Sequence, residues 1–161
     1  MKKRVLFVCV ENSNRSQMAQ AFATILGGDN VEAFSAGSRP SGRVNPKAIE
    51  AMKELGYDLG VHTSKGLDEF NGQPIDAAVT MGCGDACPLV QAARRFDWQI
   101  PDPREMPPEE FRKVRDLIRE KEMRTSDEFI TALSDHVHHV VERAIARASA
   151  NNRSTLRDAD I

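Results

Sequence analysis

Short apolar runs alternate along the chain with segments in which apolar residues recur every three to four positions. The short runs predict strands at Val5–Cys9, Val31–Ser35, Asp76–Met81 and Arg95–Ile100. The periodic segments predict helices at Ser16–Leu26, Pro46–Leu55 and Pro107–Glu122. Strands that alternate with helices indicate an α/β fold, in which a four-stranded parallel sheet carries helices on both faces.

A further apolar stripe follows at helical spacing near the C-terminus. It begins after Thr125-Ser126-Asp127-Glu128, a sequence typical of a helix start, and contains Phe129, Leu133, Val137, Val140, Val141, Ala144, Ile145 and Ala148. Such a stripe must be covered, either by the preceding helix or by its copy in a homodimer. We therefore expect a main domain over 1–122, an additional C-terminal helix over 123–150 and a flexible polar tail over 151–161.

Length and charge narrow the class of protein. A chain of 161 residues is long enough for one domain with a sizeable core, and its net charge of −2 gives no overall basic field for nucleic acid or an anionic membrane. The basic start Met1–Arg4 resembles a signal peptide, but the apolar run after it is too short and breaks at Glu11; no other stretch is long enough to span a bilayer. Three cysteines are too few for a disulfide scaffold, which fits a reducing cytoplasm.

A polar loop joins the first predicted strand to the first predicted helix. It consists of Val10, Glu11, Asn12, Ser13, Asn14 and Arg15, and lies between Cys9 and Ser16. Free N–H groups at a helix start attract an anion, and Arg15 can donate two hydrogen bonds to a tetrahedral oxyanion. The same groups favour the thiolate form of Cys9, and Ser16 is placed to donate to its sulfur. A lone Cys there would be a small core residue, but Arg six positions later, followed by Ser, favours a nucleophile.

Other reactive residues follow the predicted strands in the same way. In open parallel sheets, ligands bind beyond the carboxyl ends of the strands. Cys9 lies at the end of its strand, and Cys83 and Asp102 follow theirs, so we group them at one edge. His136, His138 and His139 are interpreted as a solvated flank of the last helix, because no cysteine is near them and His62 is far away in sequence, and we predict no metal site.

The motif Cys9-x5-Arg15-Ser16 after a single strand resembles the phosphate loop of low-molecular-weight protein tyrosine phosphatases, and equally that of the arsenate reductases that share their fold. Ser35-Ala36-Gly37 and Asp102-Pro103 match further landmarks of both groups, and the resemblance covers about the first 120 residues. It implies a flavodoxin-like fold. It also implies that Cys9 is the nucleophile, that Arg15 and the loop amides bind the oxyanion, that Ser16 tunes the thiolate, and that Asp102 protonates the departing oxygen.

The segment Thr80–Pro88, followed by Trp98, resembles the redox segment of thioredoxin-coupled arsenate reductases. The resemblance implies that Cys9 attacks arsenate, that Cys83 then attacks Cys9, and that a Cys83–Cys87 disulfide is finally reduced by thioredoxin, without a bound cofactor. Phosphate and sulfate would compete as oxyanions. The spacing of Cys83 and Cys87 is shorter than in the best-known members, so their order stays open, and so does a small thiol such as mycothiol, or glutathione through a glutaredoxin-like protein, as the donor.

Two other functions stay open. A tyrosine phosphatase would hydrolyse a phosphocysteine at Cys9, but Arg104-Glu105 stand where such enzymes usually carry aromatic residues, and Tyr57 is the single tyrosine. A non-catalytic oxyanion-binding or redox-sensing module is the alternative from another class.

Relatives also bind potassium beside the loop, through residues that correspond to Asn12, Ser35 and Thr63. The acidic residues that complete this potassium site in relatives are replaced here by Gln20 and Lys65. We therefore hypothesise that the ammonium of Lys65 takes the cation's place. Glu11 is expected to point away from the anion, because like charges repel.

Overall fold

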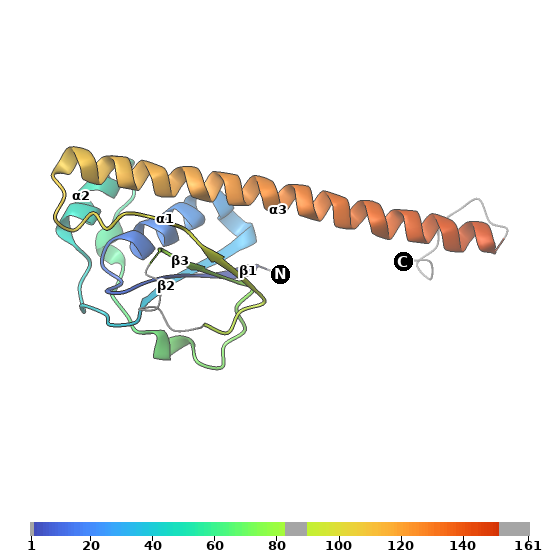
Figure 1. Cartoon of the computed structure of the whole chain (residues 1–161), viewed down its shortest axis with the longest axis horizontal. Coiled ribbons are helices and arrows are strands. Elements are labelled where there is room, and N and C mark those ends of the chain that lie inside the picture. The colour runs from blue at the N-terminus through green and yellow to red at the C-terminus, as the bar shows by residue number, and fades with distance from the viewer. Residues whose placement is uncertain (1, 83–89, 152–161) are drawn as a thin grey trace. The chain divides into compact units, whose positions relative to one another are not determined.

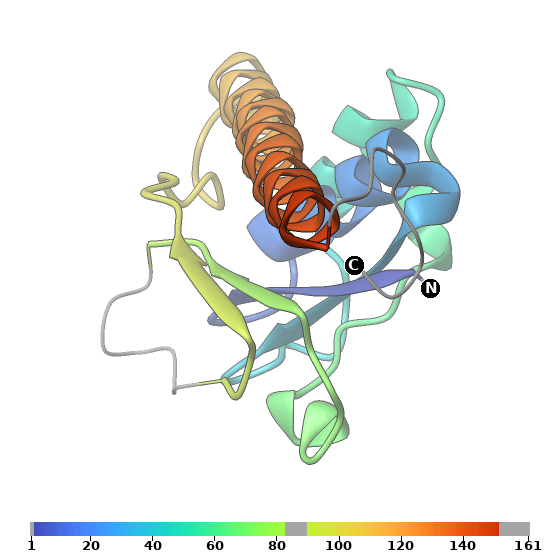
Figure 2. The same ribbon diagram turned by 90° about the vertical axis from the view of Figure 1, so that its right-hand side faces the viewer.

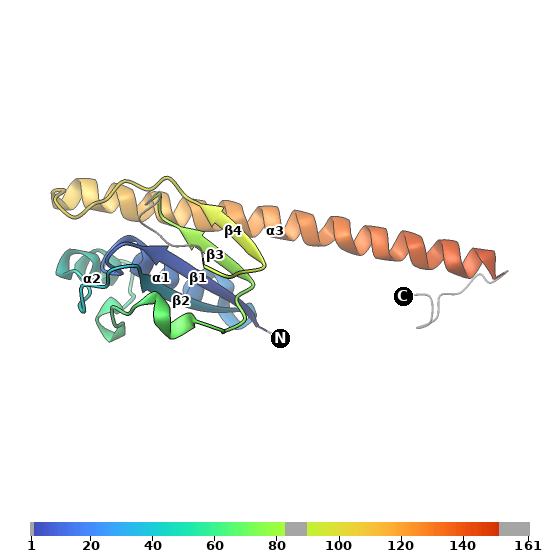
Figure 3. The same cartoon turned by 60° about the horizontal axis from the view of Figure 1, so that its bottom comes forward.

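Four parallel strands form one sheet in the order β2-β1-β3-β4. The computed structural model describes residues 2–82 and 90–151, except the side chains of 124–140. Its elements are β1 (Lys3–Cys9), α1 (Arg15–Gly27), η1 (Gly28–Asn30), β2 (Val31–Gly37), α2 (Pro46–Lys53), η2 (Leu59–Val61), η3 (Leu67–Phe70), β3 (Ala77–Thr80), β4 (Arg94–Asp97) and α3 (Pro108–Ala150) (Figure 1). Figure 3 shows the four strands side by side in this order.

The first strand lies in the middle of the sheet, because β2 and β3 pair on either side of it. Leu6, Phe7 and Val8 are at most 1% exposed, as a strand covered on both faces requires. The register places Gly37 beside Cys9 and Thr80 beside Val8. The ends of three strands therefore meet where the polar loop begins.

The fourth strand is shorter than the pattern predicts and covers Arg94–Asp97 rather than 95–100. The reason is local: Ile100 N donates to the Trp98 carbonyl at 2.8 Å, so the backbone turns sharply there. The apolar signal at Trp98 and Ile100 is nevertheless correct, since both side chains are buried in the core. Here the sequence identifies burial better than it identifies the strand.

Helical segments lie on both faces of the sheet, as predicted. One face carries α-helices, and the other carries the short 3₁₀ helix η3. The larger apolar cluster joins one face to α1, α2 and the first turns of α3 through Phe7, Met18, Phe22, Met52, Phe111 and Ile118. The smaller cluster joins Leu6, Val8 and Ala36 to Phe70 of η3 on the opposite face. Figure 2 shows α1 and η3 on opposite sides of the strands.

The predicted C-terminal helix is present, but it does not start separately. A new helix was expected at Thr125, but α3 runs without interruption for 43 residues from Pro108 to Ala150. No Gly or Pro interrupts 109–150, and Met123 and Arg124 favour helix, so nothing ends the first segment. By residue contacts the chain divides into the units Met1–Glu122 and Met123–Ile161.

The apolar stripe of the second unit is described only in part. Ala144 and Ala148 are buried, whereas Val141 and Ile145 are 43% and 50% exposed. Homodimerisation through this stripe stays a prediction, and the predicted tail after Asn151 lies outside the described residues. None of the described helices is both long and apolar enough to cross a membrane.

One buried carboxyl group belongs to the first unit. Glu122 continues the core-facing positions Phe111, Val114 and Ile118 of α3 and is only 8% exposed. Its Oε1 has no hydrogen-bond partner within the described part of the chain. Burial raises the pKa of Glu122 to about 8, because the charged form loses its hydration.

Candidate oxyanion-binding site

Cys9 ends β1 and is buried, with 3% exposure and no disulfide partner among the described residues. Two groups of the following loop contact its sulfur. Asn12 N donates to Sγ at 3.2 Å, and Ser16 Oγ lies 3.0 Å from Sγ. Asn12 Nδ2 donates to Ser16 Oγ at 2.9 Å, so the hydroxyl accepts there and its own proton is free for Cys9. Two donors therefore converge on one sulfur, an arrangement that stabilises negative charge.

Arg15 begins α1 and is held by the segments that follow two other strands, β3 and β4. Its Nη1 donates to the carbonyls of Met81 and Ile100, both at 2.9 Å. The residue is only 8% exposed, and these two acceptors offset the loss of water around its charge. Nη2 lies 3.5 Å from Asp102 Oδ2. The guanidinium is thus fixed beside Cys9 before any anion binds.

The carbonyls of the loop are bonded to the segment that follows β2. Those of Cys9, Val10, Glu11 and Ser13 accept from the backbone N–H groups of Ser38, Arg39, Ser41 and Asn45. The carbonyl dipoles are therefore engaged by other backbone. This leaves the loop free to present N–H groups to an anion, as a helix N-terminus does.

Gly37 explains why the motif Ser35-Ala36-Gly37 accompanies the loop. A Cβ atom on Gly37 would lie 2.6 Å from Val10 O and 2.8 Å from Asn12 N, both backbone atoms. The end of β2 can therefore approach the loop only as glycine. Asn12 itself adopts a φ of +48°, a left-handed conformation that Asn tolerates better than most residues.

A buried amide that the sequence analysis missed supports the loop from behind. Gln17 Nε2 donates to Asn12 O, Asn12 Oδ1 and Thr63 O at 3.1, 2.9 and 3.0 Å. Its Oε1 lies 3.0 Å from His62 Nδ1, and His62 Nε2 lies 2.8 Å from the Tyr57 hydroxyl. Burial lowers the pKa of His62, and the nearby Lys65 charge adds to this, so the neutral ring is favoured. The only sequence signal for Gln17 is its position after Arg15-Ser16.

Asn12 and Thr63, which correspond to potassium ligands in relatives, both contact the Gln17 side-chain amide. Asn12 Oδ1 also accepts from the Lys65 backbone N–H at 2.8 Å, and Ser35 Oγ donates to Gln20 Oε1 at 2.7 Å. Gln17 thus bonds both Asn12 Oδ1 and the Thr63 carbonyl, and the Lys65 backbone also bonds Asn12 Oδ1. The substitution of the Lys65 ammonium for a cation stays a prediction.

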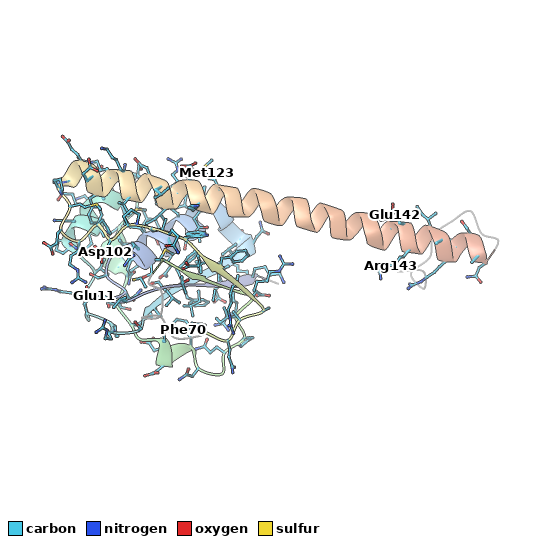
Figure 4. The ribbon with its side chains drawn as sticks, in the orientation of Figure 1. Glu11, Phe70, Asp102, Met123, Glu142 and Arg143 are labelled. Atoms are coloured by element: carbon cyan, nitrogen blue, oxygen red, sulfur yellow. The ribbon has the colours of Figure 1, made fainter. Side chains whose placement is uncertain are left out.

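The second side of the site is a turn after β4. Asp102 is exposed over 48% of its side chain, and its Oδ1 accepts from Arg104 N at 3.2 Å. A small pocket between this turn and the loop is lined by Cys9, Val10, Glu11, Ser13, Asn14, Arg15, Asp102 and Arg104. Figure 4 shows Glu11 and Asp102 at the same end of the domain. The predicted nucleophile, arginine and acid therefore share one pocket.

Glu11 does not turn away from this pocket, contrary to expectation. It lines the pocket, and its carboxylate forms an ion pair with Arg104. The repulsion expected between Glu11 and an anion is thus reduced by pairing rather than by distance. The sequence offered no direct signal for this contact.

Cys83 and Cys87 lie outside the described residues, so their geometry stays a prediction. The last described residues before this segment are Met81, whose carbonyl contacts Arg15, and Gly82, which has a φ of +70°.

The three histidines of α3 also lie outside the described side chains. Among the described residues, no group of three or more His, Cys, Asp or Glu side chains could hold a metal ion.

Comparisons with known proteins agree with this geometry. A family model described as "Low molecular weight phosphotyrosine protein phosphatase" matches residues 4–138. An "Arsenate reductase 2" from Staphylococcus epidermidis is 42% identical over 122 residues, which cover 73% of this chain and 92% of the relative. A "Glutaredoxin arsenate reductase" from Synechocystis is 39% identical over 122 residues, with 74% and 92% coverage.

Solved structures give the same result. A structure described as an arsenate reductase in the phosphate binding state has a TM-score of 0.71 and 37% identity, and covers 78% of this chain and 98% of its own. A thioredoxin-dependent arsenate reductase from Corynebacterium glutamicum has a TM-score of 0.61 and 34% identity, with coverage of 78% and 63%.

Proposed function

This chain belongs to the low-molecular-weight phosphotyrosine protein phosphatase family. Because its relatives in that family include arsenate reductases, we propose that it is an arsenate reductase that serves arsenic detoxification. The observation that carries this proposal is the position of Arg15. It lies beside Cys9 and is bonded to Met81 O, two residues before Cys83. One arginine thus links the oxyanion pocket to the chain that leads to a second thiol.

In the first step, the Cys9 thiolate attacks the arsenic atom of arsenate and forms an S–As bond. Asn12 N and Ser16 Oγ hold the sulfur, while Arg15 and the loop N–H groups bind the remaining oxygens. One oxygen leaves as water after protonation by Asp102. Arsenic is still pentavalent at this stage.

In the second step, the Cys83 thiolate attacks Cys9 Sγ. An S–S bond forms, the S–As bond breaks, and its electron pair stays on arsenic, which leaves as trivalent arsenite. Cys87 then attacks Cys83 and frees Cys9 as a thiolate. A dithiol donor reduces the Cys83–Cys87 disulfide, so two thiols are oxidised for each arsenate reduced.

We assign thioredoxin as this donor, as in the C. glutamicum relative, and place the reaction in a reducing cytoplasm. The Synechocystis relative is named for glutaredoxin, which keeps that donor as the alternative. Tyrosine phosphatase activity is a second candidate, because the pocket itself contains the nucleophile, arginine and acid that such an enzyme needs. Arg104 and Glu105 after Asp102-Pro103 provide no aromatic wall for a phosphotyrosine ring.

The decisive assay is arsenate-dependent NADPH oxidation with thioredoxin and thioredoxin reductase, with glutathione and glutaredoxin in a parallel series. Wild type, Cys9→Ser, Cys83→Ser and Cys87→Ser are compared, and p-nitrophenyl phosphate hydrolysis is measured for each. Turnover that needs all three cysteines supports the relay. Rapid ester hydrolysis without arsenate turnover would instead identify a phosphatase, and oxyanion binding without any turnover a non-catalytic module.

A further inference from the structure

A carboxylate at an anion-binding pocket needs an explanation. Glu11 belongs to the loop that wraps the pocket, and it lines that pocket together with Cys9 and Arg15. A negative side chain here opposes the binding of a dianion by direct repulsion. Arg104, which lines the same pocket from the turn after Asp102, carries the compensating charge.

Both partners of the Glu11–Arg104 pair are anchored through their backbone. Glu11 O accepts from Ser41 N and from Ser64 Oγ, each at 3.0 Å. Arg104 O accepts from Lys47 Nζ at 3.1 Å, and Arg104 N donates to Asp102. The pair therefore has a defined position and joins the loop to the turn that carries the acid.

Stability is not a sufficient reason for this pair. The side chains of Glu11 and Arg104 are 33% and 46% exposed, and ion pairs this exposed contribute little to folding. Their charges nevertheless act on any anion in the pocket, because Cys9 and Arg15 in its lining are buried and water screens a charge less there. The main consequence of the pair is thus electrostatic.

We propose that Glu11 and Arg104 form a charge-balanced rim that sets the affinity of the pocket for oxyanions. Arg104 cancels the repulsion from Glu11, and Glu11 in turn prevents Arg104 from trapping phosphate or sulfate. Neither residue takes part in bond making; both determine which anions occupy the pocket and for how long. The inference rests on oxyanion binding by the pocket, as in the proposed function.

The test is a double-mutant cycle read by calorimetric titration with inorganic phosphate at low ionic strength. We expect Arg104→Gln to weaken phosphate binding roughly tenfold, because Glu11 is then uncompensated, and Glu11→Gln to tighten it roughly tenfold. The double variant should bind within about twofold of wild type, and both single effects should shrink as salt is added. Lys113→Gln is the matched control, since Lys113 forms an exposed ion pair with Glu110 on α3.

Opposite effects of the two single variants, with recovery in the double variant, support the rim. Weaker binding in both single variants would show that the pair only maintains the loop, and unchanged affinity in both would show that it is a surface contact. Either result overturns the inference while the proposed function stands. If wild type fails to bind phosphate at all, the oxyanion site itself, and with it the proposed function, is wrong.

Discussion

The two sides of the pocket are built in different ways. On the loop side, Asn12, Arg15 and Ser16 are at most 8% exposed, and their polar groups are held by backbone and by buried side chains. On the side of the turn, Asp102 and Arg104 are 48% and 46% exposed and contact solvent. The buried side fixes groups that must hold charge, and the exposed side carries groups that exchange protons and admit substrate. Substitutions should therefore differ in effect according to the side on which they fall.

The largest effect is expected for Arg15→Lys on the buried side. A lysine ammonium is a single point donor, so it cannot bond Met81 O and Ile100 O and also present two parallel donors to an oxyanion. We expect kcat/KM for arsenate to fall at least about 1000-fold in the coupled assay, while far-ultraviolet circular dichroism stays unchanged. A loss below about tenfold would mean that a positive charge alone is enough for catalysis, and that the fixed position of the guanidinium has no special role.

A smaller effect is expected for Asp102→Asn on the exposed side. The amide cannot protonate the departing oxygen, but it keeps the shape of the turn and accepts from Arg104 N. We expect kcat to fall about 100-fold with KM changed less than about threefold, measured in single-turnover and steady-state assays. If KM rises in proportion instead, Asp102 acts in binding and the distinction between the two sides is lost.

The next effect tests how closely the buried side is packed. Gly37→Ala places a methyl group against Val10 O and Asn12 N, so the loop must move. We expect arsenate turnover to fall roughly tenfold and the free energy of unfolding to fall by about 1–3 kcal/mol in urea titrations. Gly66→Ala is the matched control: Gly66 pairs with Gly37 in a β-bridge, but a Cβ there meets no atom closer than 3.7 Å. Equal losses in both variants would contradict the predicted close approach.

The sequence identified the parts of this molecule that depend on local pattern. Buried runs such as Val5–Cys9 gave the parallel sheet, and the spacing of Cys9, Arg15 and Ser16 gave the loop. The C-terminal helix was predicted correctly. Its separate start at Thr125 was wrong, because a capping sequence does not begin a helix where the preceding residues already continue one.

The contacts that it missed join residues far apart in the chain. Gln17 reaches Thr63, and Glu11 reaches Arg104, and neither pairing leaves a periodic signal. A glutamine within a helix is normally predicted to lie on the surface, whereas Gln17 is fully buried. Such contacts depend on how the loops return to one edge of the sheet, which local patterns do not determine.

Glu122 has a consequence that can be measured as heat. Its pKa is about 8 in the folded chain and 4.5 as a free side chain, so between these values the folded protein holds a proton that the unfolded chain releases. The carboxyl therefore costs no stability below its unfolded pKa and destabilises the fold as pH rises toward 8. At pH 7.5 the calorimetric enthalpy of unfolding should depend on whether HEPES or Tris, which has the larger ionisation enthalpy, takes up the proton. Glu122→Gln should remove that dependence, and its persistence in the variant would assign the proton to another group.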